Sequence, residues 1–412
     1  MSLLPRLCRL VSSIAFVLVL SLPLLQTAFG FAPTFRLSGV VPAAEEAPVS
    51  LESWHSGALQ ESIEAQIEKS LGLRDWMVRL DNQWKFWLLG VTKRPVVAGP
   101  GGWLVEDGYL TSRTHLRGNQ GTSIIGSVYA LTQAQLVLAE HGVTMLLLVT
   151  PSKTETLPEH LPLPYRLVDE ANHVRHIDLL RAILDSGCCN HLDAQRLFEQ
   201  WRDSEPDFVL FPRSGTHWSN VAAARVAVDL LDELERLSGI DLVNLDLAPR
   251  VMGKGPAASE DDMAVLANLV DHSCLRDPMP IARTQRRPGD HGAAQGLLLV
   301  SSSFAWRLAE AMQSPDVVSP LTVYYYFKSA YDYRDGRVGE KRAIDFDPAA
   351  LRAEILRYRF VVVECNVSKI PELGFGFPKA VLEAFGPPKT GFPVIARDKL
   401  DRIQRMSVPG RR

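Results

Sequence analysis

The stretch Val143-Thr144-Met145-Leu146-Leu147-Leu148-Val149 is a short, almost continuous apolar run. It lacks the alternation of polar and apolar positions that marks a half-exposed strand, so it is predicted as a strand buried on both faces. Three further runs of the same kind are predicted as strands, namely Gly296–Val300, Leu321–Phe327 and Phe360–Glu364. Such runs are typical of the interior strands of an α/β protein.

Helical segments separate these runs, and the clearest are predicted at Gly126–His141, Asn220–Ser238 and Trp306–Gln313. Buried strands that alternate with helices indicate a mostly parallel sheet with helices on both faces. In such sheets, ligands bind beyond the carboxyl ends of the strands. Functional residues are therefore expected directly after the predicted strands.

The composition is that of a globular protein, with 46% hydrophobic and 22% charged residues among 412. A net charge of -3, and no basic run with interleaved aromatic residues, argue against nucleic acid as the main partner. The five cysteines show no metal-ligand spacing, so no metal site is predicted. Those after the N-terminal segment either form disulfides or remain buried thiols.

The N-terminus carries an export or anchoring signal. Arg6 and Arg9 precede an uncharged apolar stretch from Leu10 to Phe31. A basic flank before roughly 20 apolar residues favours a retained membrane anchor, with cleavage near Ala28-Phe29-Gly30 as the alternative. The basic flank predicts that the N-terminus stays in the cytoplasm and that the rest of the chain lies across the membrane.

The predicted organisation has five parts. These are a cytoplasmic flank and anchor (1–31), a linker (32–50), a helical lead-in (51–95), the main α/β domain (96–395) and a C-terminal tail (396–412). In the lead-in, apolar residues such as Trp76, Leu80, Trp84 and Trp87 recur at helical spacing. This pattern predicts helices that pack on a larger body.

A serine and a histidine stand out after this division. Ser301-Ser302-Ser303 follows the strand Gly296–Val300, where a serine could cap the next helix or point outward from the strand-to-helix turn. At such a turn, backbone amides could stabilise an oxyanion. His217 precedes Ser219, the predicted N-cap of the helix Asn220–Ser238, and Trp218 could wall a pocket beside it. A serine, with a histidine to take its proton, is the minimum for acyl transfer.

Two further positions are ambiguous. Lys153 follows the first predicted strand and could bind an anionic substrate or pair with a buried carboxylate. Asp261-Asp262 could cap a helix or contribute to the site. For both, a structural role is the simpler interpretation.

The order of the motifs resembles the AlgJ/AlgX family of SGNH-hydrolase-like proteins, which O-acetylate cell-surface polysaccharides. The resemblance covers roughly residues 50–390, and rests on an ordered set of strings, namely Gly99-Pro100-Gly101-Gly102-Trp103-Leu104, Pro151-Ser152-Lys153, Thr216-His217-Trp218-Ser219, Asp262 before an apolar helix, and Ser303-Phe304. It implies an SGNH-hydrolase-like α/β fold and no metal or organic cofactor.

The resemblance also implies a reaction. The protein would act on the periplasmic face of the cytoplasmic membrane, or free in the periplasm if the signal were cleaved. It would take acetyl groups from a membrane-bound O-acyltransferase and place them on a polysaccharide such as alginate. Ser303 would be the acetylated nucleophile, His217 the base and then the acid, and the Ser303 amide part of the oxyanion hole. Lys153, Trp218 and Ser302 are candidates for substrate binding.

The sequence departs from the family pattern at two places. Gly215 stands where the family usually has an Asp two residues before the histidine, and Ser301-Ser302 replaces Gly-Asp before the nucleophile. Losing the orienting carboxylate of a hydrolytic triad costs about 10^4 in turnover. Candidate replacements are Asp193, Asp262 and Glu364. Otherwise a Ser-His dyad suffices, or the chain is a catalytically degenerate scaffold or binding subunit. An SGNH-type carbohydrate esterase, with water as acceptor, is the other alternative.

Overall fold

The computed structural model describes residues 3–39, 46–113, 120–167, 175–248, 251–253, 260–281, 283–314, 316–334 and 336–389. The predicted C-terminal tail, 396–412, lies outside these residues. The chain forms two compact units: residues 1–96 with 263–274, and residues 97–262 with 275–412. Each unit is described by itself.

The second unit is built on a seven-stranded sheet in the order β12-β11-β10-β9-β13-β3-β4. From β10 to β4 every neighbouring pair is parallel, whereas β10, β11 and β12 form an antiparallel edge. The strands are β3 (Thr144–Thr150), β4 (His191–Asp193), β9 (Gln295–Ser301), β10 (Val318–Tyr325), β11 (Ser329–Arg334), β12 (Arg337–Arg342) and β13 (Phe360–Asn366). The mostly parallel sheet is confirmed.

The antiparallel edge was not predicted. β12 has the sequence RVGEKR and is largely exposed, so it carries no apolar run that would mark it as a strand. The strand predicted to reach Phe327 ends at Tyr325, because Tyr326 and Phe327 adopt left-handed backbone conformations with φ of 50° and 52°. Together with Lys328 they form the tight turn into β11.

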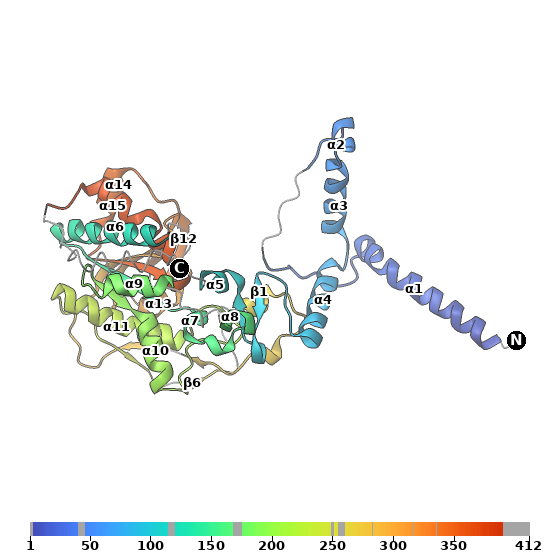
Figure 1. The fold of residues 1–412 in the computed structure, drawn as a ribbon, viewed down its shortest axis with the longest axis horizontal. Coiled ribbons are helices and arrows are strands. Elements are labelled where there is room, and N and C mark those ends of the chain that lie inside the picture. Colours follow the sequence, from blue (N-terminus) through green and yellow to red (C-terminus); the bar gives the residue numbers. More distant parts are fainter. Residues whose placement is uncertain are drawn as a thin grey trace, which may run out of the picture. The chain divides into compact units, whose positions relative to one another are not determined.

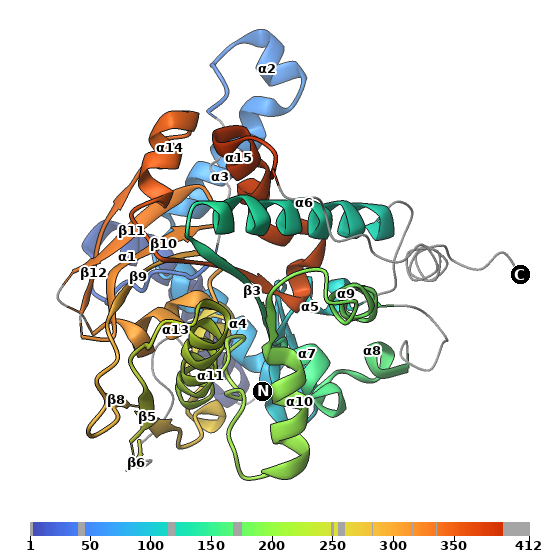
Figure 2. The ribbon, with the colours of Figure 1, turned by 90° about the vertical axis from the view of Figure 1, so that its left-hand side faces the viewer.

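Helices cover both faces of the sheet (Figure 2). Leu146 and Leu148 of β3 point into one core, whereas Met145, Leu147 and Val149 point into the other. One face packs against α10 (Ala194–Ser204), α11 (Asn220–Ser238) and α13 (Ala305–Met312). The opposite face packs against α6 (Gln120–Glu140), α9 (His176–Leu184), α14 (Pro348–Ile355) and α15 (Phe377–Phe385).

Short elements connect these layers, and β1-β2, β5-β8 and β6-β7 form small separate pairs. Cys188, Cys189, Cys274 and Cys365 are free thiols. The remaining elements are β1 (Val96–Ala98), η1 (Pro100–Gly102), β2 (Leu104–Glu106), α5 (Asp107–Ser112), α7 (Lys153–Thr156), η2 (Pro158–His160), α8 (Leu163–Leu167), β5 (Leu245–Leu247), β6 (Val251–Met252), α12 (Asp262–Leu266), η5 (Ser273–Leu275), β7 (Pro280–Ile281), β8 (Thr284–Arg286) and η6 (Val367–Gly376).

The first unit is helical and contains α1 (Leu3–Phe29), α2 (Leu51–His55), α3 (Ala58–Ser70) and α4 (Arg74–Leu89), all labelled in Figure 1. The segment 263–274, with most of α12 and η5, also belongs to it. Two described helices are long and apolar enough to cross a membrane, Arg9–Phe29 and Gly121–Glu140. The second lies in α6 and contributes to the core beneath the sheet, which accounts for its apolar composition. The first is almost unburied and is the candidate anchor.

Candidate active site

Ser303 lies at the carboxyl edge of the sheet. β9 lies between β10 and β13 and ends at Ser301, and the following turn leads into α13. The N-cap of α13 is Phe304, with no side-chain capping bond. The interpretation of the serine run as a helix cap is therefore wrong, and the Ser303 hydroxyl makes a different contact.

Ser303 is joined to His217, although the two residues lie 86 positions apart. The Ser303 Oγ is 2.8 Å from His217 Nε2, and His217 Nδ1 is 2.7 Å from Asp262 Oδ2. Both ring nitrogens are therefore engaged. The loop that carries the histidine ends at Ser219, which caps α11 by accepting a bond from the Ala222 amide, as predicted. The three side chains form a continuous line of hydrogen bonds.

Asp262 makes the carboxylate contact to His217 that Gly215 cannot make. Its second oxygen, Oδ1, accepts a hydrogen bond of 2.8 Å from the Thr216 amide, which fixes the carboxylate against the histidine loop. A Cβ on residue 215 would lie only 2.4 Å from the Glu260 carbonyl oxygen and 2.9 Å from Asp262 Oδ1. The backbone at Glu260 and the Asp262 side chain therefore fill the space that a side chain at position 215 would need. The contact between Asp262 and His217 thus depends on glycine at position 215.

The other two candidate acids lie elsewhere. Asp193 caps α10 by accepting from the Arg196 amide and pairs with Arg181 at 2.8 Å, so it serves the fold. Glu364, on β13, is fully buried and accepts hydrogen bonds from the Ser302 amide, at 2.6 Å, and from the Thr150 hydroxyl. Burial raises the pKa of Glu364, and these two donors oppose that rise. Glu364 therefore positions the turn before Ser303 rather than the imidazole.

Three residues expected to bind substrate are buried instead. Ser302 is 2% exposed, and its amide is bound by Glu364. Trp218 is fully buried and donates a hydrogen bond of 3.1 Å from Nε1 to the Phe304 carbonyl, so it is not a pocket wall. This bond ties the histidine loop to the serine turn.

Lys153 is the third of them. Its ammonium donates to the carbonyl oxygens of Leu104, at 2.9 Å, and Gly215, and it lies over the Trp103 ring. Burial lowers the pKa of Lys153 to about 7, and Asp262 opposes this shift. Lysine is rarely buried, so the sequence could not indicate that it supports the backbone beside His217.

Residues 96–303, about half of the chain, match the family described as an SGNH hydrolase-like domain of the acetyltransferase AlgX. The chain belongs to this family. The resemblance drawn from the order of the motifs is confirmed, as is the SGNH-hydrolase-like α/β fold.

The sequence identity to individual relatives is low. The chain is 24% identical over 196 residues to the probable alginate O-acetylase AlgJ of Pseudomonas aeruginosa, a match that covers 48% of this chain and 47% of that protein. The chain thus spans about half the length of this curated relative. Among solved structures it is similar to the O-acetyltransferase domain of Pseudomonas putida AlgJ (TM-score 0.41, 17% identity, covering 76% of this chain and 98% of that one). A second is Pseudomonas aeruginosa AlgX (TM-score 0.43, 12% identity, 69% and 67% covered).

Glu106 was not identified as a candidate from the sequence of this AlgX-family chain, although this residue lies near the site. It ends β2, directly after the Trp103-Leu104 motif. Burial raises the pKa of Glu106 first and Asp262 raises it further, whereas His217 and Lys369 lower it. Glu106 therefore shares the electrostatic field of the histidine and its acid. Only its position after a motif could have indicated it.

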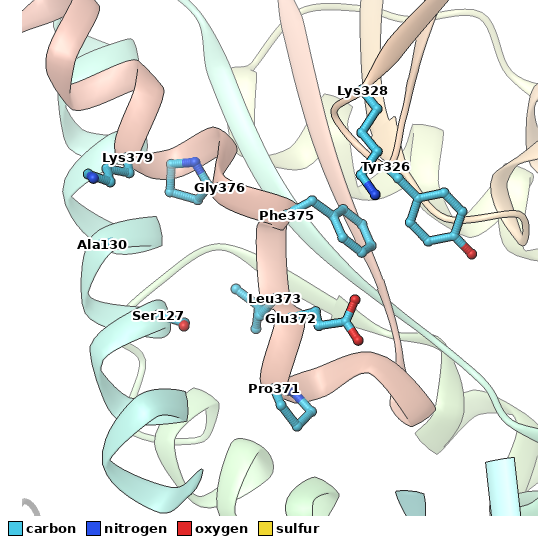
Figure 3. Close-up of a pocket in the computed structure, with 11 residues that line it drawn as sticks. Ser127, Ala130, Tyr326, Lys328, Pro371, Glu372, Leu373, Phe375, Gly376 and Lys379 are labelled. Atoms are coloured by element: carbon cyan, nitrogen blue, oxygen red, sulfur yellow. The ribbon is translucent and has the colours of Figure 1, made fainter. Parts of the chain in front are cut away.

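A cavity of about 440 Å³ opens beside η6, next to the turn that follows β10 (Figure 3). The Tyr326 amide donates a 2.7 Å hydrogen bond to the Ser301 carbonyl, which places this turn next to the end of β9. The Tyr326 and Phe375 rings contact each other edge to face, with centroids 5.2 Å apart, and Lys328 and Glu372 lie close to them. Both aromatic residues adopt positive φ, which sequence patterns do not reveal.

Within the ranges that the structure describes, no group of three or more His, Cys, Asp or Glu side chains is placed so that it could hold a metal ion. The site offers instead a hydroxyl, an imidazole and a carboxylate in contact. The Ser303 amide makes no hydrogen bond to another described residue, so it is available to a ligand. This set of groups can carry out acyl transfer.

Proposed function

We propose that the protein is an extracytoplasmic O-acetyltransferase that acetylates a cell-surface polysaccharide through an acetyl-serine at Ser303. The observation that carries this proposal is the Asp262–His217–Ser303 line, with contacts of 2.7 and 2.8 Å at the carboxyl edge of the sheet. Membership of the AlgX acetyltransferase family supports it. The contact of Asp262 with His217 also supports it, because this residue offers the carboxylate that Gly215 lacks.

In the first step, Ser303 Oγ attacks the carbonyl carbon of an acetyl donor while His217 Nε2 takes the hydroxyl proton. Asp262 accepts a hydrogen bond from His217 Nδ1–H, and this bond holds the tautomer in which Nε2 is unprotonated and can act as the base. The Ser303 amide would stabilise the oxyanion. When the tetrahedral intermediate collapses, the carbon–oxygen bond to the donor breaks and His217 returns the proton to the leaving group. The acetyl group is then esterified to Ser303.

In the second step, a sugar hydroxyl replaces the departed donor. His217 takes its proton as the sugar oxygen attacks the acetyl carbon, and the proton then passes to Ser303 Oγ as that bond breaks. The products are a sugar acetate ester and free enzyme. With water as the nucleophile, the same steps would yield acetate, so the acceptor alone separates a transferase from an esterase.

The cavity at Tyr326 and Phe375 is the proposed binding site for the acceptor chain. Aromatic rings offer apolar faces for stacking, and Lys328 and Lys379 on its lining suit an acidic polymer. One relative is a probable alginate O-acetylase, so an alginate-like exopolysaccharide is the substrate class that we propose.

The proposed location is the periplasmic face of the cytoplasmic membrane, with α1 as the anchor. α1 is apolar and nearly unburied over Arg9–Phe29, as expected of a helix that crosses a bilayer. The proposed acetyl donor is a membrane-bound O-acyltransferase, which would bring acetyl groups to this side. Cleavage after α1 would instead release the protein into the periplasm.

The decisive experiment combines the purified full chain in detergent with a chromogenic acetyl ester, with and without acidic oligosaccharides. We expect acetylated oligosaccharide, and mass spectrometry of quenched reactions should find acetyl on the Ser303 peptide. Ester hydrolysis that no sugar diverts would support the esterase instead. If Ser303→Ala left polymer acetylation in cells intact, the chain would be a non-catalytic subunit.

A further inference from the structure

Helix α4 carries its apolar residues on the outside. Trp84 and Trp87 are 64% and 63% exposed, and Met77, Leu80 and Leu88 are exposed with them. Steps of three and four residues place all five on one face of the helix. A surface helix of a soluble protein normally turns such a stripe toward the core. The helical spacing predicts that Leu80, Trp84 and Trp87 pack on a larger body, whereas in the structure these three side chains are exposed.

The polar face of α4 is the buried one. Asn82 and Gln83 are its buried residues, and both bind the backbone of the segment 263–274, which belongs to the same unit. Asn82 Nδ2 donates to the Ala267 carbonyl at 2.9 Å, and Gln83 Oε1 accepts from the Asp271 amide at 2.8 Å. Arg79 adds a bond of 3.2 Å to the Leu269 carbonyl. These bonds fix the rotation of the helix, so the apolar stripe cannot turn inward without breaking them.

The start of α4 is tied to the end of α1. The Gly72 amide donates to Thr27 Oγ1, within the last turns of α1, at 2.7 Å. Trp76 Nε1 donates to the Pro33 carbonyl at 3.0 Å, and the Phe35 ring packs edge-on against Trp76. The apolar stripe therefore begins close to the point at which the proposed membrane span ends.

We infer that α4 lies in the interfacial layer of the bilayer that α1 crosses, with the stripe toward the acyl chains. Tryptophan is enriched at this depth because its ring is apolar and its N–H is polar. An amphipathic helix with aromatic and leucine residues on one face is typical of interfacial binding. Lys93 and Arg94, exposed just after the stripe, suit anionic headgroups. The inference rests on the proposed anchor and adds a second membrane attachment.

The test uses the full chain reconstituted in phosphatidylcholine–phosphatidylglycerol vesicles, with and without brominated acyl chains, which quench tryptophan on contact. We expect brominated lipid to quench part of the emission, and the Trp84→Phe/Trp87→Phe variant to lose that part. Trp54→Phe is the matched control, because Trp54 on α2 is similarly exposed, at 59%. This variant should keep the quenching. Circular dichroism should show that all three proteins are folded.

Flotation of the vesicles tests the α1 anchor separately from the proposed contact of α4 with lipid. If the wild-type chain and the Trp84→Phe/Trp87→Phe variant both float and show the same quenching by brominated lipid, that result overturns this inference and leaves the anchor intact. A floating chain in which these tryptophans are shielded from both lipid and aqueous acrylamide also overturns it, because a second copy would then cover the stripe. A chain that does not float overturns the proposed anchor, and this inference with it.

Discussion

The central sheet and helix α4 are both rich in apolar residues, yet they use them in opposite ways. In β3, every residue from Met145 to Val149 is buried between two layers of helices. In α4, Trp84 and Trp87 are exposed, whereas the side-chain amides of Asn82 and Gln83 are buried. Periodicity shows which residues share a face, but not whether protein or lipid covers that face.

The largest effect is expected on the rate of acetyl transfer, because we assign this reaction to the edge of the sheet and not to α4. Ser303→Ala removes the acetyl acceptor, and turnover of a soluble acetyl ester should fall about 10^4-fold or more, as in hydrolytic triads. The Trp84→Phe/Trp87→Phe variant should keep the wild-type rate in the same assay. Initial rates in detergent measure both. Equal losses in the two variants would show that α4 takes part in the reaction.

The next effect concerns the relocated acid. Asp262→Asn keeps the size of the side chain but cannot stabilise an imidazolium, so turnover should fall by about 10^2 to 10^4. Asp193→Asn is the matched control, because this carboxylate caps α10 and should leave the rate unchanged. Steady-state kinetics with the same ester measure both. A fully active Asp262→Asn protein would favour a Ser-His dyad.

The same contrast predicts that two tryptophan substitutions differ in their effect on the free energy of unfolding. Trp218 is fully buried, so Trp218→Ala should lower the free energy of unfolding by about 3 to 5 kcal/mol. Trp87→Ala lies on the exposed stripe and should change it by less than about 0.5 kcal/mol in detergent. Urea denaturation followed by circular dichroism compares the two variants. A large loss for Trp87→Ala would place that ring in a protein core.

The smallest predicted effect is a dependence on pH. Burial lowers the pKa of Lys153 from 10.5 to about 7, so between these values the unfolded chain holds a proton that the folded chain has released. The free energy of unfolding therefore rises with pH in this window, by about 2 kcal/mol from pH 7 to pH 9. Lys153→Met should lack this rise. Urea denaturation at both pH values tests it, and parallel behaviour of the two proteins would contradict the assignment.

Sequence patterns predicted the interior strands well because buried parallel strands must be apolar on both faces. They did not predict β12, whose exposed polar residues need only backbone pairing, nor the left-handed turn at Tyr326. For the site, local patterns singled out Ser303 and His217 but not the tasks of Lys153 and Glu364. Both are buried ionisable groups that bind loops distant in sequence.

Local periodicity and short motifs were enough to indicate the α/β class and the family, and they singled out a serine and a histidine as candidates. The folded chain was needed to show that these two residues meet and which of three acids contacts His217. That choice depends on the approach of two chain segments 45 positions apart, and on the room that Gly215 leaves for them. It also decided the outward face of α4, because hydrogen bonds to the segment 263–274 set the rotation of the helix.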